Sequence, residues 1–213
     1  MNENLEHIKS AVIGGKHNEI EGLVEKAIQN GADLDQIVND TFASAMEIVG
    51  KKFTDGEVFV PEMLVAAVTM KKGLEIIKPL LNVAELESKG TVLMGTVKGD
   101  LHDVGKNLVI MMLEAAGFHV IDLGVDVSRE NFVQQVQEVK PDILGLSALL
   151  TTTMPEMKNV IEALEEKRLR NTVKVMVGGA PIDARFAEKI GADGYGKDAA
   201  EAVQLSKTLI APK

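Results

Sequence analysis

The pattern of hydrophobic and polar positions changes near residue 88 of the chain. Up to about residue 82, apolar residues recur every three or four positions, which is the period of amphipathic helices. Beyond residue 90, short apolar runs alternate with helical stretches. The pattern therefore predicts a helical domain over residues 1–88 and a mixed domain over residues 89–213.

Four helices with short connections are predicted in the first domain. Asn30-Gly31 is typical of a helix end, Asp33 of a helix cap and Pro61 of a first helical turn. Helices of this kind form a small four-helix bundle. The expected ranges are Leu5–Ile13, Asn18–Gln29, Asp33–Lys52 and Pro61–Leu81. The polar residues 83–90 that follow are interpreted as a linker and hinge.

Short strands that alternate with helices are predicted in the second domain. The strand ranges are Thr91–Val97, His119–Leu123, Ile143–Ala148, Lys174–Val177 and Ala192–Tyr195. The helix ranges are Val104–Ala116, Arg129–Val139, Pro155–Lys167, Ile182–Ile190 and Ala199–Ile210. Continuous apolar strands are typical of parallel sheets covered on both faces. The prediction is an α/β fold with a flavodoxin-like, doubly wound, five-stranded parallel sheet, which binds ligands beyond the carboxyl ends of its strands.

Composition narrows the classes of function. The formal net charge is −9 and no basic stripe is evident, which argues against binding to nucleic acid or to a membrane surface. The absence of cysteine excludes disulfides, thiolate metal sites and cysteine nucleophiles. No apolar stretch approaches the roughly 20 residues of a membrane span, and the first residues lack the layout of a secretory signal. We therefore expect a cytoplasmic protein.

The loop after the first predicted strand carries Asp100, His102 and Asp103 and then enters a helix past Gly105. Residues two apart share a face in an extended segment, so the carboxylate of Asp100 can lie beside the imidazole of His102. Such a carboxylate fixes the tautomer and orientation of a metal-bound histidine. The same residues also fit a helix-entry loop, in which Asp100 or Asp103 caps the helix and His102 lies on the surface. The D-x-H spacing alone leaves both interpretations open.

Small and polar residues follow the other strands. After the third strand come Ser147, Leu149 and the hydroxyls of residues 151–153, where a phosphoacceptor domain would need an aspartate. This argues against phosphotransfer, although Thr153 is also a suitable cap for the next helix. Adjacent glycines in Gly178-Gly179, and a Tyr195-Gly196 pair, let backbone approach a bulky ligand or simply form tight turns. Their alignment along one sheet edge indicates a binding site.

Taken together, three motifs resemble the cobalamin-binding module of methionine synthase and the small corrinoid proteins of methanol, methylamine and methoxyaromatic methyltransferase systems. The motifs are D-x-H-x-x-G (Asp100, His102, Gly105), S-x-L (Ser147, Leu149) and G-G (Gly178, Gly179). The resemblance covers nearly the whole chain, because the family also places a helical bundle before the binding domain. It implies cobalamin or a related corrinoid, whose cobalt cycles between methyl-Co(III) and Co(I).

The resemblance also implies roles for single residues. His102 would displace the cofactor's own lower base and bind cobalt, an arrangement termed base-off/His-on. Thr153, Asp100 and His102 would form a relay that couples proton uptake to loss of the cobalt–histidine bond. The detached nucleotide tail would enter a slot lined by Ser147, Leu149, Gly178 and Gly179. The remaining implied cofactor contacts are Asp103, Val104, Gly105, Thr151, Tyr195 and Gly196.

In the helical domain, Phe53 and Val60 align with the apolar residues that shield the methyl group in methionine synthase. Both also fit an ordinary bundle core. Val60 is smaller than the leucine usual at that place, so its shielding role is the less direct of the two.

The function implied is that of a methyl carrier, which acts as a non-autonomous subunit of a methyltransferase system in methanogenesis or acetogenesis. One partner, a substrate:corrinoid methyltransferase, would deliver the methyl group, and a second would pass it to a thiol or a pterin. A reductive activator is a further implied partner. The donor (methanol, a methylamine, betaine or a methoxyaromatic) is chosen by the partner enzyme.

Three alternatives remain open on the sequence. The binding subunit of an adenosylcobalamin-dependent mutase shares the motifs but does not usually begin with this bundle. A cobalamin-sensing regulator would need a DNA-binding segment or a shielding tryptophan, and the chain has no tryptophan. A flavodoxin-like module for flavin or nucleotide is the third, and the scarcity of aromatic residues weakens it.

Overall fold

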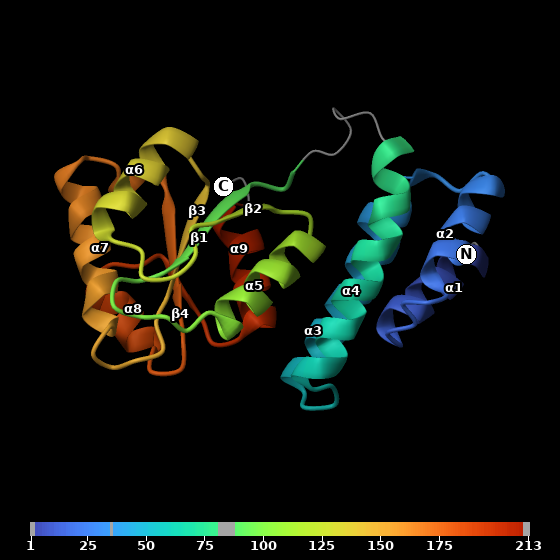
Figure 1. Ribbon diagram of the computed structural model, residues 1–213, viewed down its shortest axis with the longest axis horizontal. Coiled ribbons are helices and arrows are strands. Elements are labelled where there is room, and N and C mark those ends of the chain that lie inside the picture. Colours follow the sequence, from blue (N-terminus) through green and yellow to red (C-terminus); the bar gives the residue numbers. More distant parts are fainter. Residues whose placement is uncertain (1–2, 35, 81–87, 211–213) are drawn as a thin grey trace. The chain divides into compact units, whose positions relative to one another are not determined.

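The computed structural model of the chain describes residues 3–34, 36–80 and 88–210 (Figure 1). It separates into two compact units, one formed mainly by the residues before Ser88 and the other mainly by the residues after it. Within the described ranges, none of the helices has both the length and the apolar character that crossing a membrane requires. The predicted hinge over residues 83–90 falls mostly outside the described residues.

The first unit consists of helices packed around an apolar core. Its α-helices are α1 (Glu3–Ile13), α2 (Ile20–Gln29), α3 (Ala43–Thr54) and α4 (Val60–Ile77). A π-helix, η1 (Gln36–Phe42), precedes α3, and a 3₁₀-helix, η2 (Lys78–Leu80), follows α4. The largest fully buried side chains of the unit are Ile8, Ile20, Ile37, Phe42, Met63 and Ile77. Amphipathic helices of this length are stable because they bury such a stripe together.

The third predicted helix differs from the observed one at its start. An α-helix was expected from Asp33, whereas the chain forms the π-helix η1 before α3 begins at Ala43. Ile37 and Phe42 are both fully buried and lie five positions apart. A π-helix repeats its hydrogen bonds every five residues and brings such a pair to one side, whereas an α-helix separates them.

The second unit confirms the predicted fold class. Five parallel strands form one sheet in the order β2-β1-β3-β4-β5. The strands are β1 (Thr91–Thr96), β2 (His119–Asp122), β3 (Ile143–Ser147), β4 (Lys174–Gly178) and β5 (Gly194–Gly196). The helices are α5 (Val104–Ala115), α6 (Arg129–Val139), α7 (Met154–Glu166), α8 (Ala184–Ile190) and α9 (Ala199–Ile210), with a short 3₁₀-helix, η3 (Arg170–Thr172), before β4.

Helices cover both faces of this sheet. Figure 1 shows α6, α7 and α8 on one face and α5 and α9 on the other. The side chains of β1, β3 and β4 alternate between two packed layers, which explains why these strands are almost entirely buried and uniformly apolar. One layer joins Leu93, Leu144 and Val175 to residues of α6 and α7 such as Phe132 and Leu164.

The register of the strands aligns their last residues along one edge of the sheet, the edge formed by the carboxyl ends of the strands. Thr96 at the end of β1 lies opposite Ser147 of β3, Ser147 lies opposite Gly178 of β4, and Gly178 lies opposite Gly196 of β5. The loops that carry the predicted site residues therefore leave the sheet from one edge. In open parallel sheets this edge is where ligands bind.

Candidate functional site

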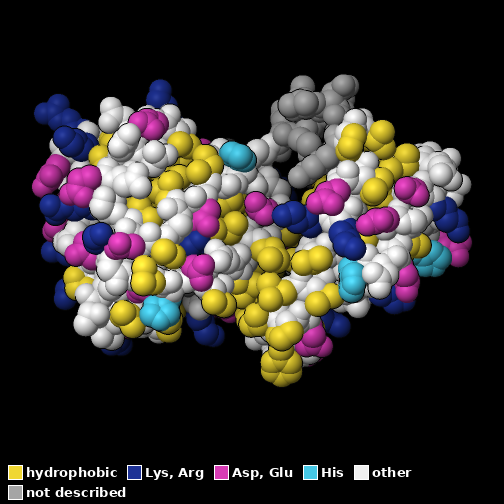
Figure 2. Space-filling model, in the orientation of Figure 1, with side chains coloured by type: hydrophobic (Ala, Val, Ile, Leu, Met, Phe, Trp, Pro, Cys, Tyr) yellow, Lys and Arg dark blue, Asp and Glu magenta, His cyan; other side chains and the backbone are white. Residues whose placement is uncertain are grey.

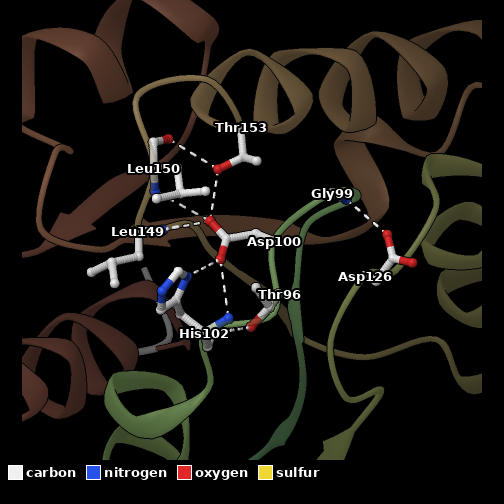
Figure 3. A network of polar contacts seen from close by, with 8 residues as sticks. All are labelled: Thr96, Gly99, Asp100, His102, Asp126, Leu149, Leu150 and Thr153. Carbon is white, nitrogen blue, oxygen red and sulfur yellow. Dashed lines mark hydrogen bonds and ion pairs between the residues drawn. The ribbon is translucent and has the colours of Figure 1, made fainter.

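The centre of this edge is a pair of side chains in the loop between β1 and α5. The Nδ1 atom of His102 lies 2.7 Å from Oδ1 of Asp100, and the backbone N–H of His102 donates to the same oxygen over 3.1 Å. Figure 3 shows the imidazole beside this carboxylate. The hydroxyl of Thr96 donates to the carbonyl of His102 over 3.0 Å and so holds the far end of the loop.

The carboxylate of Asp100 is completely buried, and hydrogen bonds reach both of its oxygens. Its Oδ2 accepts from the backbone N–H of Leu149 over 2.8 Å and of Leu150 over 3.2 Å. It also accepts from the hydroxyl of Thr153 over 2.7 Å. Burial alone would raise the pKa of Asp100, but the bonds from Thr153, Leu149 and His102 outweigh it and lower this pKa far below the usual range. Asp100 is therefore an anion at neutral pH.

The charge of Asp100 decides the tautomer of His102. An ionised carboxylate only accepts hydrogen bonds, so Nδ1 of His102 must be the donor. In the neutral imidazole the proton then sits on Nδ1, and Nε2 presents a lone pair. Nε2 makes no hydrogen bond to the described residues, and half of the His102 side chain is exposed. The ring therefore offers one oriented nitrogen ligand to an incoming metal.

Two cap interpretations from the sequence are corrected by the structure. Thr153 occupies the position before α7, but its side chain makes no cap hydrogen bond and donates to Asp100 instead. Asp100 does not cap α5, because its Oδ2 bonds the turn after β3 and its Oδ1 bonds His102. Asp103 lies at the entry to α5, where its carboxylate accepts from the side-chain amide of Asn107 over 3.1 Å.

Exposed apolar side chains flank His102 in the sequence and also lie on the turn that binds Asp100. Leu101 and Val104 are 72% and 78% exposed, which is unusual for large aliphatic side chains in a loop and a first helical turn. Leu149 and Leu150 are 43% and 40% exposed on the neighbouring turn. The space beside Gly105 is open, because a Cβ there would meet nothing within 4 Å. A flat, largely apolar group can therefore approach His102.

The glycines at the ends of β4 and β5 are required by close backbone packing. Gly179 has a φ of +133°, and a Cβ there would overlap the backbone carbonyl of Ala148. A Cβ on Gly178 would lie 3.1 Å from the carbonyl oxygen of Gly196. These residues keep side chains away from the edge between β3 and β5. A side chain at either position would therefore disturb the close backbone packing at this edge.

Other predicted site residues lie on the same edge without direct contact to His102. Ser147 ends β3, and its hydroxyl makes no hydrogen bond to the described residues. Thr151 is exposed in the turn after β3. Tyr195 packs against the apolar core of the sheet, and burial together with nearby carboxylates raises its pKa.

Phe53 and Val60 belong to the helical unit. Phe53 is half-buried in the last turn of α3, and Val60 is 37% exposed at the start of α4. The neighbouring Phe59 is 67% exposed, more than either predicted residue. Sequence reasoning passed over Phe59, although its place beside Val60 was a possible signal.

Two further interactions at the site were missed from the sequence. The ammonium group of Lys106, in the first turn of α5, is buried and lies 2.6 and 2.7 Å from the carboxylate oxygens of Asp122 at the end of β2. Asp126, in the loop after β2, hydrogen-bonds the loop that carries Asp100. Each of these acidic residues stands between two aliphatic residues in the sequence, but neither belongs to a spacing pattern that marks a binding site.

The described residues contain no group of three or more histidine, cysteine, aspartate or glutamate side chains that could hold a metal ion. A single oriented histidine suits a metal whose other positions are already filled by a macrocycle. The exposed apolar side chains on the His102 loop and on the neighbouring turn suit the faces of such a macrocycle. The residues present therefore fit a corrinoid.

Comparison with known proteins decides the family. A family model described as a B12 binding domain matches residues 90–204, and a second model with the same description matches residues 5–78. The chain belongs to the B12-binding corrinoid proteins. The resemblance inferred from the three motifs and the expected cofactor, cobalamin or a related corrinoid, are thereby confirmed. The family match also sets aside the flavodoxin-like module for flavin or nucleotide.

Relatives of this corrinoid protein span its full length. It is 44% identical over 209 residues to a corrinoid protein of Desulfitobacterium hafniense, with 97% of each chain covered. It is 45% identical over 210 residues to dimethylamine corrinoid protein 1 of Methanosarcina acetivorans, with 98% of each covered. The structure matches a chain of the methanol:cobalamin methyltransferase complex of Methanosarcina barkeri with a TM-score of 0.87 and 31% identity, covering 100% of this chain and 81% of that one.

Proposed function

We propose that this corrinoid protein binds its cofactor base-off/His-on through Nε2 of His102 and carries a methyl group between two methyltransferases. The observation that carries the proposal is the bond from Nδ1 of His102 to the buried, anionic Asp100, which leaves Nε2 as the outward ligand atom. A corrinoid supplies a cobalt centre that takes up and releases a methyl group. The protein supplies orientation, an axial ligand and an apolar surface.

The residues around His102 would each hold or guide the cofactor. Leu101, Val104 and Leu149 would contact the lower face of the macrocycle. The first two are exposed and flank the ligand in the sequence, and Leu149 is exposed on the turn that binds Asp100. The nucleotide tail would follow the glycine-lined edge at Gly178 and Gly179. Asp100 and Thr153 would complete a relay through which His102 can exchange a proton when it leaves the metal.

The identities of the relatives support the choice of partners. One full-length relative is named for dimethylamine, and the matched structure is a complex with a methanol methyltransferase. We infer that the first partner is a substrate:corrinoid methyltransferase for a simple methyl donor of this kind. A second methyltransferase would pass the methyl group to a thiol or a pterin, and a reductive activator would restore Co(I). Donor choice would lie with the first partner, as the resemblance to the corrinoid proteins implies.

The division of labour within the chain is part of the proposal. Residues 89–213 would bind the cofactor and residues 1–88 would act as a cap, with Phe53 and Val60 shielding the methyl group. The separate matches to residues 90–204 and 5–78 support two functional parts. We expect Phe53→Ala to leave cofactor binding intact and to speed loss of the methyl group to solvent, measured by the absorbance change of methylated protein in the dark. Unchanged loss would contradict the shielding role.

The test of the ligand uses purified protein loaded with aquocobinamide, a corrinoid that lacks the lower base, and then reduced to the Co(II) state, so that any nitrogen ligand comes from the protein. In that state an imidazole ligand adds nitrogen splitting to the cobalt EPR lines. We expect the splitting in the wild type and its loss in His102→Ala. His7→Ala, which changes an exposed histidine of α1, is the matched control and should keep the splitting. Nitrogen splitting that persists in His102→Ala would refute the proposed ligand.

A further inference from the structure

Asp100 is held by hydrogen bonds from both sides, from the loop after β2 and from the turn after β3. Only the bonds from the turn after β3 include a member of the proposed relay, Thr153. The side chain of Asp100 is bound on the β3 side, by the turn that contains Leu149 and Thr153. Its main chain is bound on the β2 side, by Asp126. In Figure 3, Asp100 lies between Asp126 and the turn after β3. The strand order β2-β1-β3 makes this two-sided support possible.

Asp126 makes two hydrogen bonds to adjacent residues of the loop. Its Oδ1 accepts from the backbone N–H of Gly99 over 2.8 Å. Its own backbone N–H donates to the carbonyl of Asp100 over 3.0 Å. Together these bonds close a ring around the Gly99–Asp100 segment and fix the direction in which the Asp100 side chain leaves the backbone.

The conformation of this contact needs particular residue types. Gly99 has a φ of +80° and Asp126 has a φ of +54°, both in the left-handed region. Most residues with a Cβ avoid this region, but aspartate and asparagine tolerate it. Asp126 therefore combines a tolerated backbone conformation with an acceptor of the right length.

The loop that carries Asp126 is itself fixed to the end of β1. The N–H of Thr96 donates to the carbonyl of Gly124, and the N–H of Val127 donates to the carbonyl of Thr96, each over 3.0 Å. Val97 and Val127 form a parallel bridge beyond the ends of the strands. Asp126 therefore acts from a rigid support, and its carboxylate can set the position of a neighbouring loop.

Asp126 also forms an ion pair, which is expected to matter less than its two hydrogen bonds to the Gly99–Asp100 segment. The ammonium group of Lys98 lies 3.1 Å from Oδ1 of Asp126, and both side chains are about half exposed. The pKa of Asp126 is lowered, first by the bond from Gly99 and then by Lys98. Exposed ion pairs contribute little, so the bond to the Gly99 N–H is the interaction expected to matter.

We propose that Asp126 is a positioning residue for the cobalt ligand, because it fixes the backbone of Asp100 and thereby the orientation of His102. The proposal rests on His102 as the axial ligand. Partners one shell beyond a metal ligand typically change metal binding by about 10- to 100-fold when they are removed. Asp126 acts one step further away, so the lower end of that range is expected.

Three variants separate the hydrogen bond from Gly99 to Asp126, the negative charge of Asp126 and the ion pair with Lys98. Asp126→Gly keeps the left-handed conformation without strain but removes the acceptor. Asp126→Asn keeps an acceptor for the Gly99 N–H and loses the negative charge. Lys98→Met removes only the ion pair. In cofactor-free protein, we expect faster amide exchange at Gly99 in Asp126→Gly and wild-type exchange in Lys98→Met.

The deciding measurement is the ratio of His-ligated to unligated Co(II) in protein loaded with aquocobinamide, which lacks a lower base, and then reduced; the ratio is read from nitrogen splitting in the EPR spectrum. We expect this ratio to fall about tenfold in Asp126→Gly and to stay near the wild-type value in Asp126→Asn and Lys98→Met. A wild-type ratio in Asp126→Gly, or equal losses in Asp126→Gly and Asp126→Asn, would overturn the proposal. Failure of the ligand assignment itself would show separately, as absence of splitting in the wild type.

Discussion

At the scale of the residue, the anionic side chain of Asp100 needs hydrogen-bond partners more than an exposed carboxylate does, because it is completely buried. A buried charge without partners is costly, and the protein avoids that cost with two backbone amides, one hydroxyl and the His102 loop. Such a group is strongly constrained in position because each donor fixes it from a different direction. The same constraint makes it a firm support for the imidazole of His102, the proposed metal ligand.

The hydroxyl of Thr153 should contribute measurably to stability. Thr153→Val keeps the shape of the side chain but removes a buried donor to a charged acceptor, so we expect a loss of about 2 kcal/mol in the free energy of unfolding. Thr153→Ser keeps the hydroxyl and should lose less than about 1 kcal/mol, the share of one methyl group. Urea unfolding of cofactor-free protein measures both. Equal losses in the two variants would show that the hydroxyl adds nothing.

A partly buried carboxylate elsewhere in the sheet unit, that of Asp193, is expected to make stability depend on pH. Asp193 accepts from Arg170 over 2.7 Å and from the backbone N–H of Val175 over 2.8 Å. Burial acts to raise the pKa of Asp193, but these bonds together lower it. The stabilisation is then fully present above the unfolded-state pKa of about 3.9 and is lost as the pH falls through the lower pKa of the folded state.

We therefore expect Asp193→Asn to be less stable than the wild type at pH 7, with a difference that shrinks once the pH falls below about 4. Urea unfolding at pH values of about 7, 5 and 3.5 measures the difference. Asp55→Asn, which removes an exposed carboxylate, controls for the change in net charge. A difference that stays constant over this range would contradict the assignment.

At this scale the sequence predicts what lies close together along the chain. The pairing of Asp100 with His102 follows from a spacing of two residues. The contact of Asp100 with Thr153 bridges more than fifty residues, and it was expected only through resemblance to a family. The contact with Asp126 depends on a positive φ and on the path of the loop after β2, neither of which leaves a spacing pattern.

At the scale of the element, the packing of the helical unit depends on a close approach of other helices to Gly73. Gly73 lies in α4 beside the ring of Phe42 in η1, and a Cβ on Gly73 would lie 2.6 Å from the Cζ atom of that ring. It would also lie 3.1 Å from Cγ1 of Ile20 in α2. The absence of a side chain at this position therefore allows three helical segments to meet.

Gly73→Ala is expected to destabilise the helical unit. Overpacking costs about 1–3 kcal/mol, which exceeds the gain of up to about 1 kcal/mol from replacing a helical glycine by alanine. Gly22→Ala is the matched control, because nothing lies within 4 Å of a Cβ there and the helix propensity gain should appear alone. Thermal unfolding followed by far-UV circular dichroism should move the two variants in opposite directions. A stabilised Gly73→Ala would contradict the packing argument.

Most elements were predictable because their patterns are local. Amphipathic repeats predicted α1, α2 and α4, and continuous apolar runs predicted β1, β3 and β4. The π-helix η1 was not predicted, because the five-residue spacing of Ile37 and Phe42 does not fit the period of an α-helix. The geometry of η1 is set by the packing of these two side chains. The short η3 likewise has no pattern of its own.

At the scale of the whole molecule, the face shown in Figure 2 carries acidic and basic side chains in mixture, without a basic stripe. This agrees with a net charge of −9 and with a protein that meets other proteins and a small cofactor. The order β2-β1-β3-β4-β5 brings the functional loops together, although these loops are distributed from Gly99 to Gly196 in the sequence.

Cofactor binding should stabilise the sheet unit by linkage. At a free hydroxocobalamin concentration 100 times the Kd, a ligand that binds only the folded state adds about 2.7 kcal/mol, which corresponds to roughly 100-fold slower exchange of amides that require global opening. We expect this slowing for β1 and β3 amides in the wild type and a smaller one in His102→Ala at the same concentration. Equal slowing in both proteins would mean that His102 adds no binding energy.

The anchoring of Asp100 by main-chain amides has a consequence for protein engineering. Leu149 and Leu150 hold the carboxylate through their backbone N–H groups, while their side chains face outward and are free of that task. A combinatorial library at these two positions could therefore be selected for acceptance of synthetic corrins with altered rims. The anchor of the proposed axial ligand would be inherited unchanged by every member of that library without proline at these two positions.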